Sequence, residues 1–210
     1  INRGINKIRG GHNCANIILN SINFAPIEEC QRKGDWDGTA RILSNAARDI
    51  QAAGADFLLI CTNTMHRVAD QVQAAVDIPL LHIADATAQA LIDKNIQKVG
   101  LLGTAFTMEQ DFYKGRLETQ FGLEVLVPDN AGRQSVHTII YDQLCRGIIA
   151  DDSRTKYLDI IQDLSRKGAQ GVILGCTEIG LLVKSEHTRV PLFDTALIHA
   201  GQAVARALSP

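Results

Sequence analysis

The sequence lacks the features by which membrane, secreted and nucleic-acid-binding proteins are usually recognised. Its longest apolar runs, such as residues 57–61 and 172–174, are far shorter than the roughly 20 residues that cross a bilayer. The first residues carry charge but no apolar segment of the kind that a secretory signal needs. The 21 basic and 23 acidic residues are interspersed, without a block of like charge. We therefore expect neither a membrane nor a nucleic acid among the partners.

Cysteine is missing from the arrangements that form disulfide frameworks or bind zinc. The chain has five cysteines, an odd number, with no C-x-x-C pair and no close spacing of His and Cys. This pattern argues against both kinds of structure and is typical of a protein in a reducing compartment. We expect a cytoplasmic protein.

The composition is that of a chain that folds on its own. It has 210 residues, of which 46% are hydrophobic, and a formal net charge of −2. A chain of this length buries about 70% of the surface that its unfolded form exposes, which is enough for a full core. Short apolar runs alternate with stretches of helical periodicity, which indicates βαβ units with a parallel sheet covered by helices. The expected strands are residues 16–22, 56–60, 80–83, 98–102, 171–174 and 191–193.

The chain contains an internal repeat. At an offset of 114 positions, GADFLLICTNT (54–64) matches GAQGVILGCTE (168–178) in the opening Gly-Ala, the apolar strand and the polar tripeptide. Two further pairs of segments match in order: 37–54 with 151–168, and 78–86 with 190–196 at an offset of 112. Gly54 and Gly168 each end a helical stretch, so we expect both at the C′ position. We interpret the chain as a duplicated α/β unit.

The repeat predicts how the chain divides into domains. The first unit spans residues 1–95 and is completed by 194–210, and the second spans 96–193. The second unit opens with a strand and a Gly-rich turn, KVGLLGTAFTM (98–108), whose counterpart in the first unit falls before residue 1. We therefore expect a further strand and loop upstream of this sequence.

The repeat also places Thr62 opposite Cys176. The turns 62–64 and 176–178 thus follow equivalent strands, at the carboxyl ends where open α/β sheets bind ligands. Reactive side chains on two sides of a bound molecule can remove a proton from one face and deliver one to the other, which inverts a stereocentre. A thiol suits this role because its pKa, about 8.5 in free cysteine, is lowered at a helix N-terminus. Backbone N–H groups in such turns suit a carboxylate.

Five motifs spread along the chain are specific when taken together. They are CTNTMH (61–66), HIADAT (82–87), LLGTAFTMEQDFYKGRL (101–117), GCTEIGLL (175–182) and PLFDTALIHA (191–200). With these motifs the chain resembles, over essentially its whole length, the cofactor-independent aspartate/glutamate racemases, and most closely the bacterial broad-specificity amino-acid racemases. The resemblance implies an α/β fold of two pseudosymmetric domains, with largely parallel sheets flanked by helices and an active site in the inter-domain cleft. It also implies no pyridoxal phosphate or other cofactor, one acid/base residue from each domain, and a homodimer.

One position departs from the family pattern. The first turn of the family usually reads C-N-T-x-H, whereas residues 62–66 of this chain read T-N-T-M-H, with Thr62 at the place of the first catalytic cysteine. Cys61 lies one residue earlier, where strand alternation directs it away from the cleft, and we interpret it as a buried core cysteine. Because an alcohol is a much weaker acid than a thiol, we expect Cys176 to remove the Cα proton of one antipode and Thr62 to deliver a proton on the other face.

The resemblance further implies a set of substrate-binding side chains. Asn63, Thr64 and Thr177 could simply cap helices, and the resemblance adds a contact with the substrate. Glu178 has two open interpretations, a first-turn helix carboxylate or a contact to the substrate ammonium. Gln31 lies where members of the subgroup place a contact to the substrate side chain.

The sequence therefore predicts an amino-acid racemase or epimerase, independent of pyridoxal phosphate, that acts at Cα of aspartate, glutamate or another small amino acid. Two alternatives stay open. One is a cofactor-free decarboxylase or cis–trans isomerase of the same superfamily. The other is a catalytically inactive amino-acid-binding protein.

Overall fold

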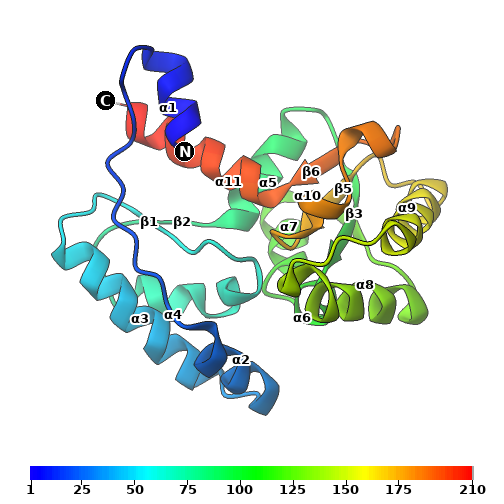
Figure 1. The fold of residues 1–210 in the computed structure, drawn as a ribbon, viewed down its shortest axis with the longest axis horizontal. Coiled ribbons are helices and arrows are strands. Elements are labelled where there is room, and N and C mark those ends of the chain that lie inside the picture. Colours follow the sequence, from blue (N-terminus) through cyan, green and yellow to red (C-terminus); the bar gives the residue numbers. More distant parts are fainter. Residues whose placement is uncertain (210) are drawn as a thin grey trace. The chain divides into compact units, whose positions relative to one another are not determined.

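The computed structural model describes residues 1–209, which form two compact units (Figure 1). Unit 1 comprises Ile1–Ile60, Met65–His82 and the C-terminal residues from Ala200. Unit 2 comprises Cys61–Thr64 and Ile83–His199. None of the helices in the described part of the chain is long and apolar enough to span a membrane.

Unit 1 packs helices against a short sheet. Strand β1 (Leu58–Leu59) pairs in parallel with β2 (Leu80–Leu81). The helices are α1 (Asn2–Arg9), α2 (Phe24–Lys33), α3 (Trp36–Ala52), α4 (Ala69–Gln73), the 3₁₀ helix η1 (Thr64–Val68) and the C-terminal part of α11 (Thr195–Leu208). The apolar face of α3 buries Ala40 and Ala47 against Leu58 of the sheet, because apolar residues recur along α3 at helical spacing.

Unit 2 is built on a four-stranded parallel sheet with the strand order β4-β3-β5-β6. Its strands are β3 (Lys98–Gly103), β4 (Glu124–Leu126), β5 (Val172–Gly175) and β6 (Leu192–Asp194). Its helices are α5 (Ile83–Ile92), α6 (Ala105–Glu109), α7 (Lys114–Phe121), α8 (Asn130–Asp142), η2 (Leu144–Arg146), α9 (Asp151–Arg166), α10 (Ile179–Leu182), η3 (Ser185–His187) and the first residues of α11. The expected α/β class with parallel sheets and flanking helices is confirmed.

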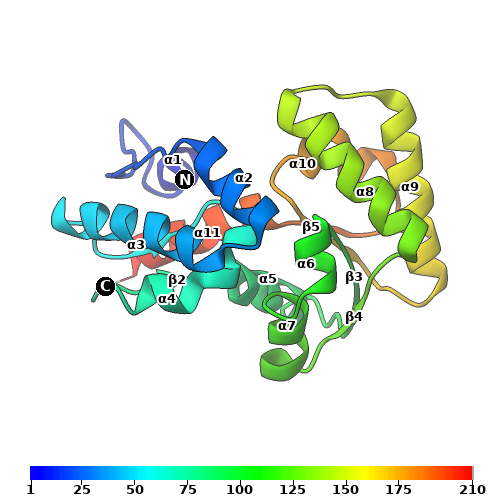
Figure 2. The same cartoon turned by 90° about the horizontal axis from the view of Figure 1, so that it is seen from below.

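The two faces of this sheet bury different sets of side chains. Leu102 and Leu174 pack in one core with the buried residues of α8 and α9. Leu101 and Ile173 pack in a second core with buried residues of α5 and α7. Figure 2 shows α5 and α7 on one side of this sheet and α8 and α9 on the other. This alternation follows from the two-residue period of a strand, and it explains why β5 and the part of β3 that follows Lys98 are apolar without interruption.

Hydrogen bonds of the backbone confirm the internal repeat. In unit 1, Leu58 pairs with Leu80, and its N–H donates to Pro79 O at 2.9 Å. At the repeat offset in unit 2, Val172 pairs with Leu192, and its N–H donates to Pro191 O at 2.8 Å. The strand pairing is therefore the same in both halves.

The helices that precede these strands end alike as well. Gly54 follows α3 with φ 91°, and Gly168 follows α9 with φ 98°. In this conformation a side chain would be strained, which is why both halves have glycine there. The predicted C′ positions are confirmed.

One predicted strand is absent from the structure, and one observed strand was not predicted. The predicted strand at 16–22 is wrong, because these residues form neither helix nor strand, and Leu19 is 78% exposed. An apolar run needs a partner strand to become part of a sheet. Conversely, β4 was not predicted, since it has three residues of which only Val125 is buried.

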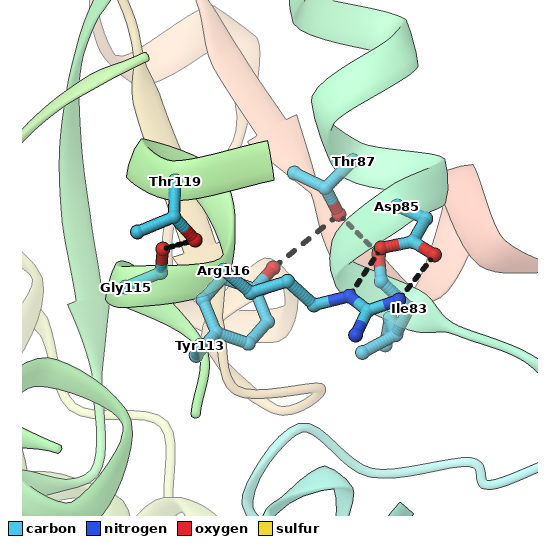
Figure 3. Close-up of polar contacts among 7 residues, drawn as sticks. All are labelled: Ile83, Asp85, Thr87, Tyr113, Gly115, Arg116 and Thr119. Atoms are coloured by element: carbon cyan, nitrogen blue, oxygen red, sulfur yellow. Dashed lines mark hydrogen bonds and ion pairs between the residues drawn. The ribbon is translucent and has the colours of Figure 1, made fainter. Parts of the chain in front are cut away.

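The boundary between the units also differs from the division expected at residue 95. Helix α5 packs in unit 2, where Ala84, Ala88 and Leu91 are fully buried. Polar contacts fasten it to α7 (Figure 3): Arg116 donates from Nε and Nη2 to the two carboxylate oxygens of Asp85 at 2.5 and 2.8 Å. A second link, shown in the same view, runs from Tyr113 Oη to Thr87 Oγ1 at 3.3 Å and on to Ile83 O at 2.8 Å.

Candidate active site

The first polar turn is held by unit 2, although it directly follows a strand of unit 1. Asn63 Nδ2 donates to Thr195 Oγ1 at 2.9 Å. Thr195 Oγ1 donates in turn to Leu174 O on β5, also at 2.9 Å. Both side chains are buried, so this relay connects the turn at 62–64 to the carboxyl end of β5.

A cluster of three buried hydroxyls connects the same turn to the end of β3. Thr64 Oγ1 lies 3.0 Å from Thr104 Oγ1 and 3.5 Å from Thr107 Oγ1, and the latter two atoms are 3.2 Å apart. Thr104 is the N-cap of α6, and its Oγ1 accepts a hydrogen bond from the N–H of Thr107. The turn at 62–64 thus contacts the carboxyl ends of both central strands.

Glycines allow β3 and β5 to end very close together. Gly103 is paired with Gly175 in the sheet. A Cβ on Gly175 would lie 2.8 Å from Leu102 O, and a Cβ on Gly103 would lie 2.9 Å from Gly175 O. Both positions therefore need glycine for close approach of the backbones. The chain leaves the sheet at this point into the turn that contains Cys176.

In the second turn, one carboxylate accepts two hydrogen bonds. Glu178 Oε2 accepts from Cys176 Sγ at 2.9 Å and from Thr177 Oγ1 at 2.8 Å. Burial raises the pKa of Cys176 well above its usual value, and the charge and hydrogen bond of Glu178 raise this pKa further. The predicted lowering of this pKa is wrong, because burial and the Glu178 carboxylate raise it, and α10, with four residues, is too short for a strong helix dipole. Cys176 is accordingly a protonated thiol.

Six of the seven predicted site residues belong to unit 2, and Gln31 belongs to unit 1. Thr62 is partly buried. Gln31 is buried, and its Nε2 donates to Met65 Sδ at 3.8 Å. The interpretation of Cys61 as a buried core residue is wrong, since Cys61 is exposed. The strand β1 ends two residues before Cys61, so strand alternation no longer determines where its side chain points.

Three threonines that contact the turn at 62–64 were not predicted as site residues from the sequence. Thr104 and Thr107 lie in the segment 98–108 of the second unit, which the sequence identified only as a strand and a Gly-rich turn. Thr195 has Ile83 as its repeat counterpart, so the comparison of the halves showed no polar pattern at this position.

A histidine supports the start of α6. His137 Nδ1 accepts the N–H of Ala105 at 3.1 Å, and burial lowers the pKa of this imidazole. Its Nδ1 is therefore unprotonated in the folded protein. Among residues 1–209, no three His, Cys, Asp or Glu side chains gather in a way that could hold a metal ion.

Comparison with known proteins identifies the family. The sequence profile of the Asp/Glu/hydantoin racemases matches residues 1–203, and the chain belongs to this family. It is 22% identical over 182 residues to the broad-specificity amino-acid racemase RacX of Bacillus subtilis, covering 83% of this chain and 75% of that protein. A Yersinia pestis structure described as a candidate Asp/Glu racemase is 50% identical with a TM-score of 0.92, covering 99% of this chain and 90% of that one. An aspartate racemase homologue from Pyrococcus horikoshii is 34% identical with a TM-score of 0.81, covering 98% and 90%.

Proposed function

We propose that this chain is an amino-acid racemase or epimerase that acts, without pyridoxal phosphate, at Cα of aspartate, glutamate or another small amino acid. The observation that carries the proposal is the hydrogen bond between Cys176 and Glu178 just after β5. Cys176 occupies the position of the second half that is equivalent to Thr62 in the first half. The family, and the likeness to a broad-specificity racemase and to an aspartate racemase homologue, support the reaction and the substrate class.

The hydrogen bond between Cys176 and Glu178 provides a route for the thiol proton. Transfer of this proton across 2.9 Å to Glu178 leaves a thiolate, which then removes the Cα proton from one antipode. Thr62 delivers a proton to the opposite face, and a water molecule replaces the proton that its hydroxyl gives up, because an alcohol is too weak an acid to do so readily by itself. The hydroxide that forms then takes the proton from Glu178, which restores the starting protonation states. Since enantiomers have equal free energy in water, kcat/KM is the same in both directions. A preference for one antipode then appears only as compensating differences in kcat and KM.

The remaining predicted residues are assigned to substrate binding. We assign the substrate carboxylate to the hydroxyls of Thr64 and Thr177, with the backbone N–H groups of the two turns. Asn63 and Glu178 supply oxygen acceptors for the ammonium. Gln31 is kept as a contact for the substrate side chain. A cytoplasmic location and a homodimer complete the proposal.

The test is proton NMR in D₂O with L-aspartate, L-glutamate and a panel of neutral L-amino acids, without added pyridoxal phosphate. Loss of the Cα–H signal shows proton abstraction and identifies the substrate, and a chiral assay gives the stereochemical outcome. We expect Cys176→Ala to abolish exchange. Cys61→Ala is the matched control, and we expect it to keep the wild-type rate within about twofold because surface substitutions rarely have larger effects.

The reverse result for these two cysteines would overturn the assignment of Cys176. Binding of an amino acid without any Cα–H exchange would instead support an inactive binding protein. Release of CO₂ from a malonate-type acid, or isomerisation of maleate, would replace the racemase proposal if no amino acid exchanges its Cα proton.

A further inference from the structure

The side-chain oxygen of Asn63 is an exception among the buried polar groups of the chain. Asn63 is 2% exposed, and within residues 1–209 its Oδ1 is the buried side-chain atom without a hydrogen-bond partner. A buried amide oxygen normally has a donor, because losing its contact with water is costly. An acceptor of this kind is suited to a donor that a bound molecule supplies.

Thr195 determines the orientation of the Asn63 amide, that is, whether its Nδ2 or its Oδ1 faces Thr195. The carbonyl of Leu174 is an acceptor only, so Thr195 uses its one hydroxyl hydrogen on that carbonyl. Toward Asn63, also at 2.9 Å, the same hydroxyl can only accept. Asn63 must therefore present its NH₂ group to Thr195. Thr195 is fully buried, so water does not compete for its hydroxyl.

We propose that Thr195 is a positioning residue, which orients the Asn63 amide so that Oδ1 accepts a hydrogen bond from the α-ammonium of a bound amino acid. This inference rests on the proposed function and specifies its substrate class. An α-amino acid has an N–H donor next to Cα, whereas a dicarboxylic acid of the same length without the amino group has none. The oriented oxygen therefore selects amino acids over such acids, including malonate-type and maleate-type acids.

The experiment compares Thr195→Val, which keeps the shape but lacks the hydroxyl, with Thr195→Ser, which keeps the hydroxyl. Calorimetry measures Kd for two matched pairs of ligands, L-aspartate with succinate and L-glutamate with glutarate. In Thr195→Val we expect amino-acid binding to weaken roughly 10- to 100-fold, the range for a lost hydrogen bond to a charged group. Succinate and glutarate should change by less than about threefold, and Thr195→Ser should resemble wild type for all four ligands.

Hydrogen exchange of the Asn63 side-chain NH₂ is a readout that needs no ligand. Its ¹⁵N resonance is assigned by its absence from Asn63→Asp. We expect these protons to be protected from exchange in wild type and in Thr195→Ser, and to exchange rapidly in Thr195→Val. If Thr195→Val does not fold, the wild-type measurement still decides, because unprotected NH₂ protons would overturn the proposal.

Equal weakening of amino acids and their des-amino acids in Thr195→Val would show that Thr195 only supports the fold, and would reject the inference. Unchanged binding of all four ligands would reject it as well. Failure of the proposed function has a different signature, namely no Cα–H exchange in wild type with any amino acid.

Discussion

Replacing Gly175 by alanine tests the close approach of β3 and β5 on which the candidate site depends. The added Cβ would lie 2.8 Å from Leu102 O, 3.0 Å from Leu101 Cδ1 and 3.4 Å from Thr107 Cγ2. The leucine side chain can move aside. The carbonyl cannot, because the strands are paired at this register.

The expected cost follows from this overlap. The Cβ would stand about 0.6 Å inside ordinary contact with a backbone oxygen, and overpacking of a buried site costs about 1–3 kcal/mol. For a chain of this size each kcal/mol changes Tm by about 2–4 °C, so Gly175→Ala should lower Tm by about 2–12 °C. Because Cys176 directly follows Gly175, separating the strands also displaces the thiol, and Cα–H exchange should slow.

Thermal unfolding and the exchange assay are measured on the same preparations. Gly201→Ala is the matched control, because Gly201 lies inside α11 and a Cβ there would meet no atom within 4 Å. We expect this control to gain about 0.5–1 kcal/mol from the lower entropy of its unfolded chain and to keep its activity. A Gly175→Ala protein that melts and exchanges like wild type would refute the argument from strand proximity.

Two further predictions concern titrating groups. Burial lowers the pKa of His137, so the folded protein binds fewer protons than the unfolded chain. The stability gained from His137 should be complete above about pH 6.5 and lost as the pH falls. The Tm of wild type should therefore exceed that of His137→Leu by less at acidic pH than at neutral pH. A difference in Tm that grows on acidification would contradict this. Glu178→Gln removes a charge that raises the pKa of Cys176, so iodoacetamide should alkylate Cys176 faster at a fixed pH. Peptide mass spectrometry measures this rate, and the exposed Cys61 serves as the internal reference. An unchanged or slower rate at Cys176 would contradict the assigned electrostatic role of Glu178.

The fold class could be predicted because it follows from local patterns that repeat. The strands at β1 and β5 are apolar runs preceded by helices of matching length, and the same backbone pairing appears in both halves. The segment at 16–22 has the same local pattern, but a strand also requires a neighbour, and no local pattern predicts one.

The site could be predicted only in part, because sequence patterns do not report contacts between distant residues. The repeat drew attention to Thr62 and Cys176, which occupy matched positions. The hydrogen bond from Asn63 to Thr195 joins residues that are 132 positions apart. The repeat did not indicate it, because the residue equivalent to Thr195 is the apolar Ile83. The pKa of Cys176 depends on the burial of its thiol and on the position of the Glu178 carboxylate, and the sequence specifies neither.

The raised pKa of Cys176 also affects the chemical durability of the protein. Peroxides and other oxidants attack thiolates far faster than thiols, so a cysteine with a low pKa is vulnerable whenever it is idle. Burial and the hydrogen bond to Glu178 keep the sulfur of Cys176 protonated in the resting protein. The same carboxylate that takes the proton in the proposed reaction thereby protects the sulfur from oxidation between turnovers.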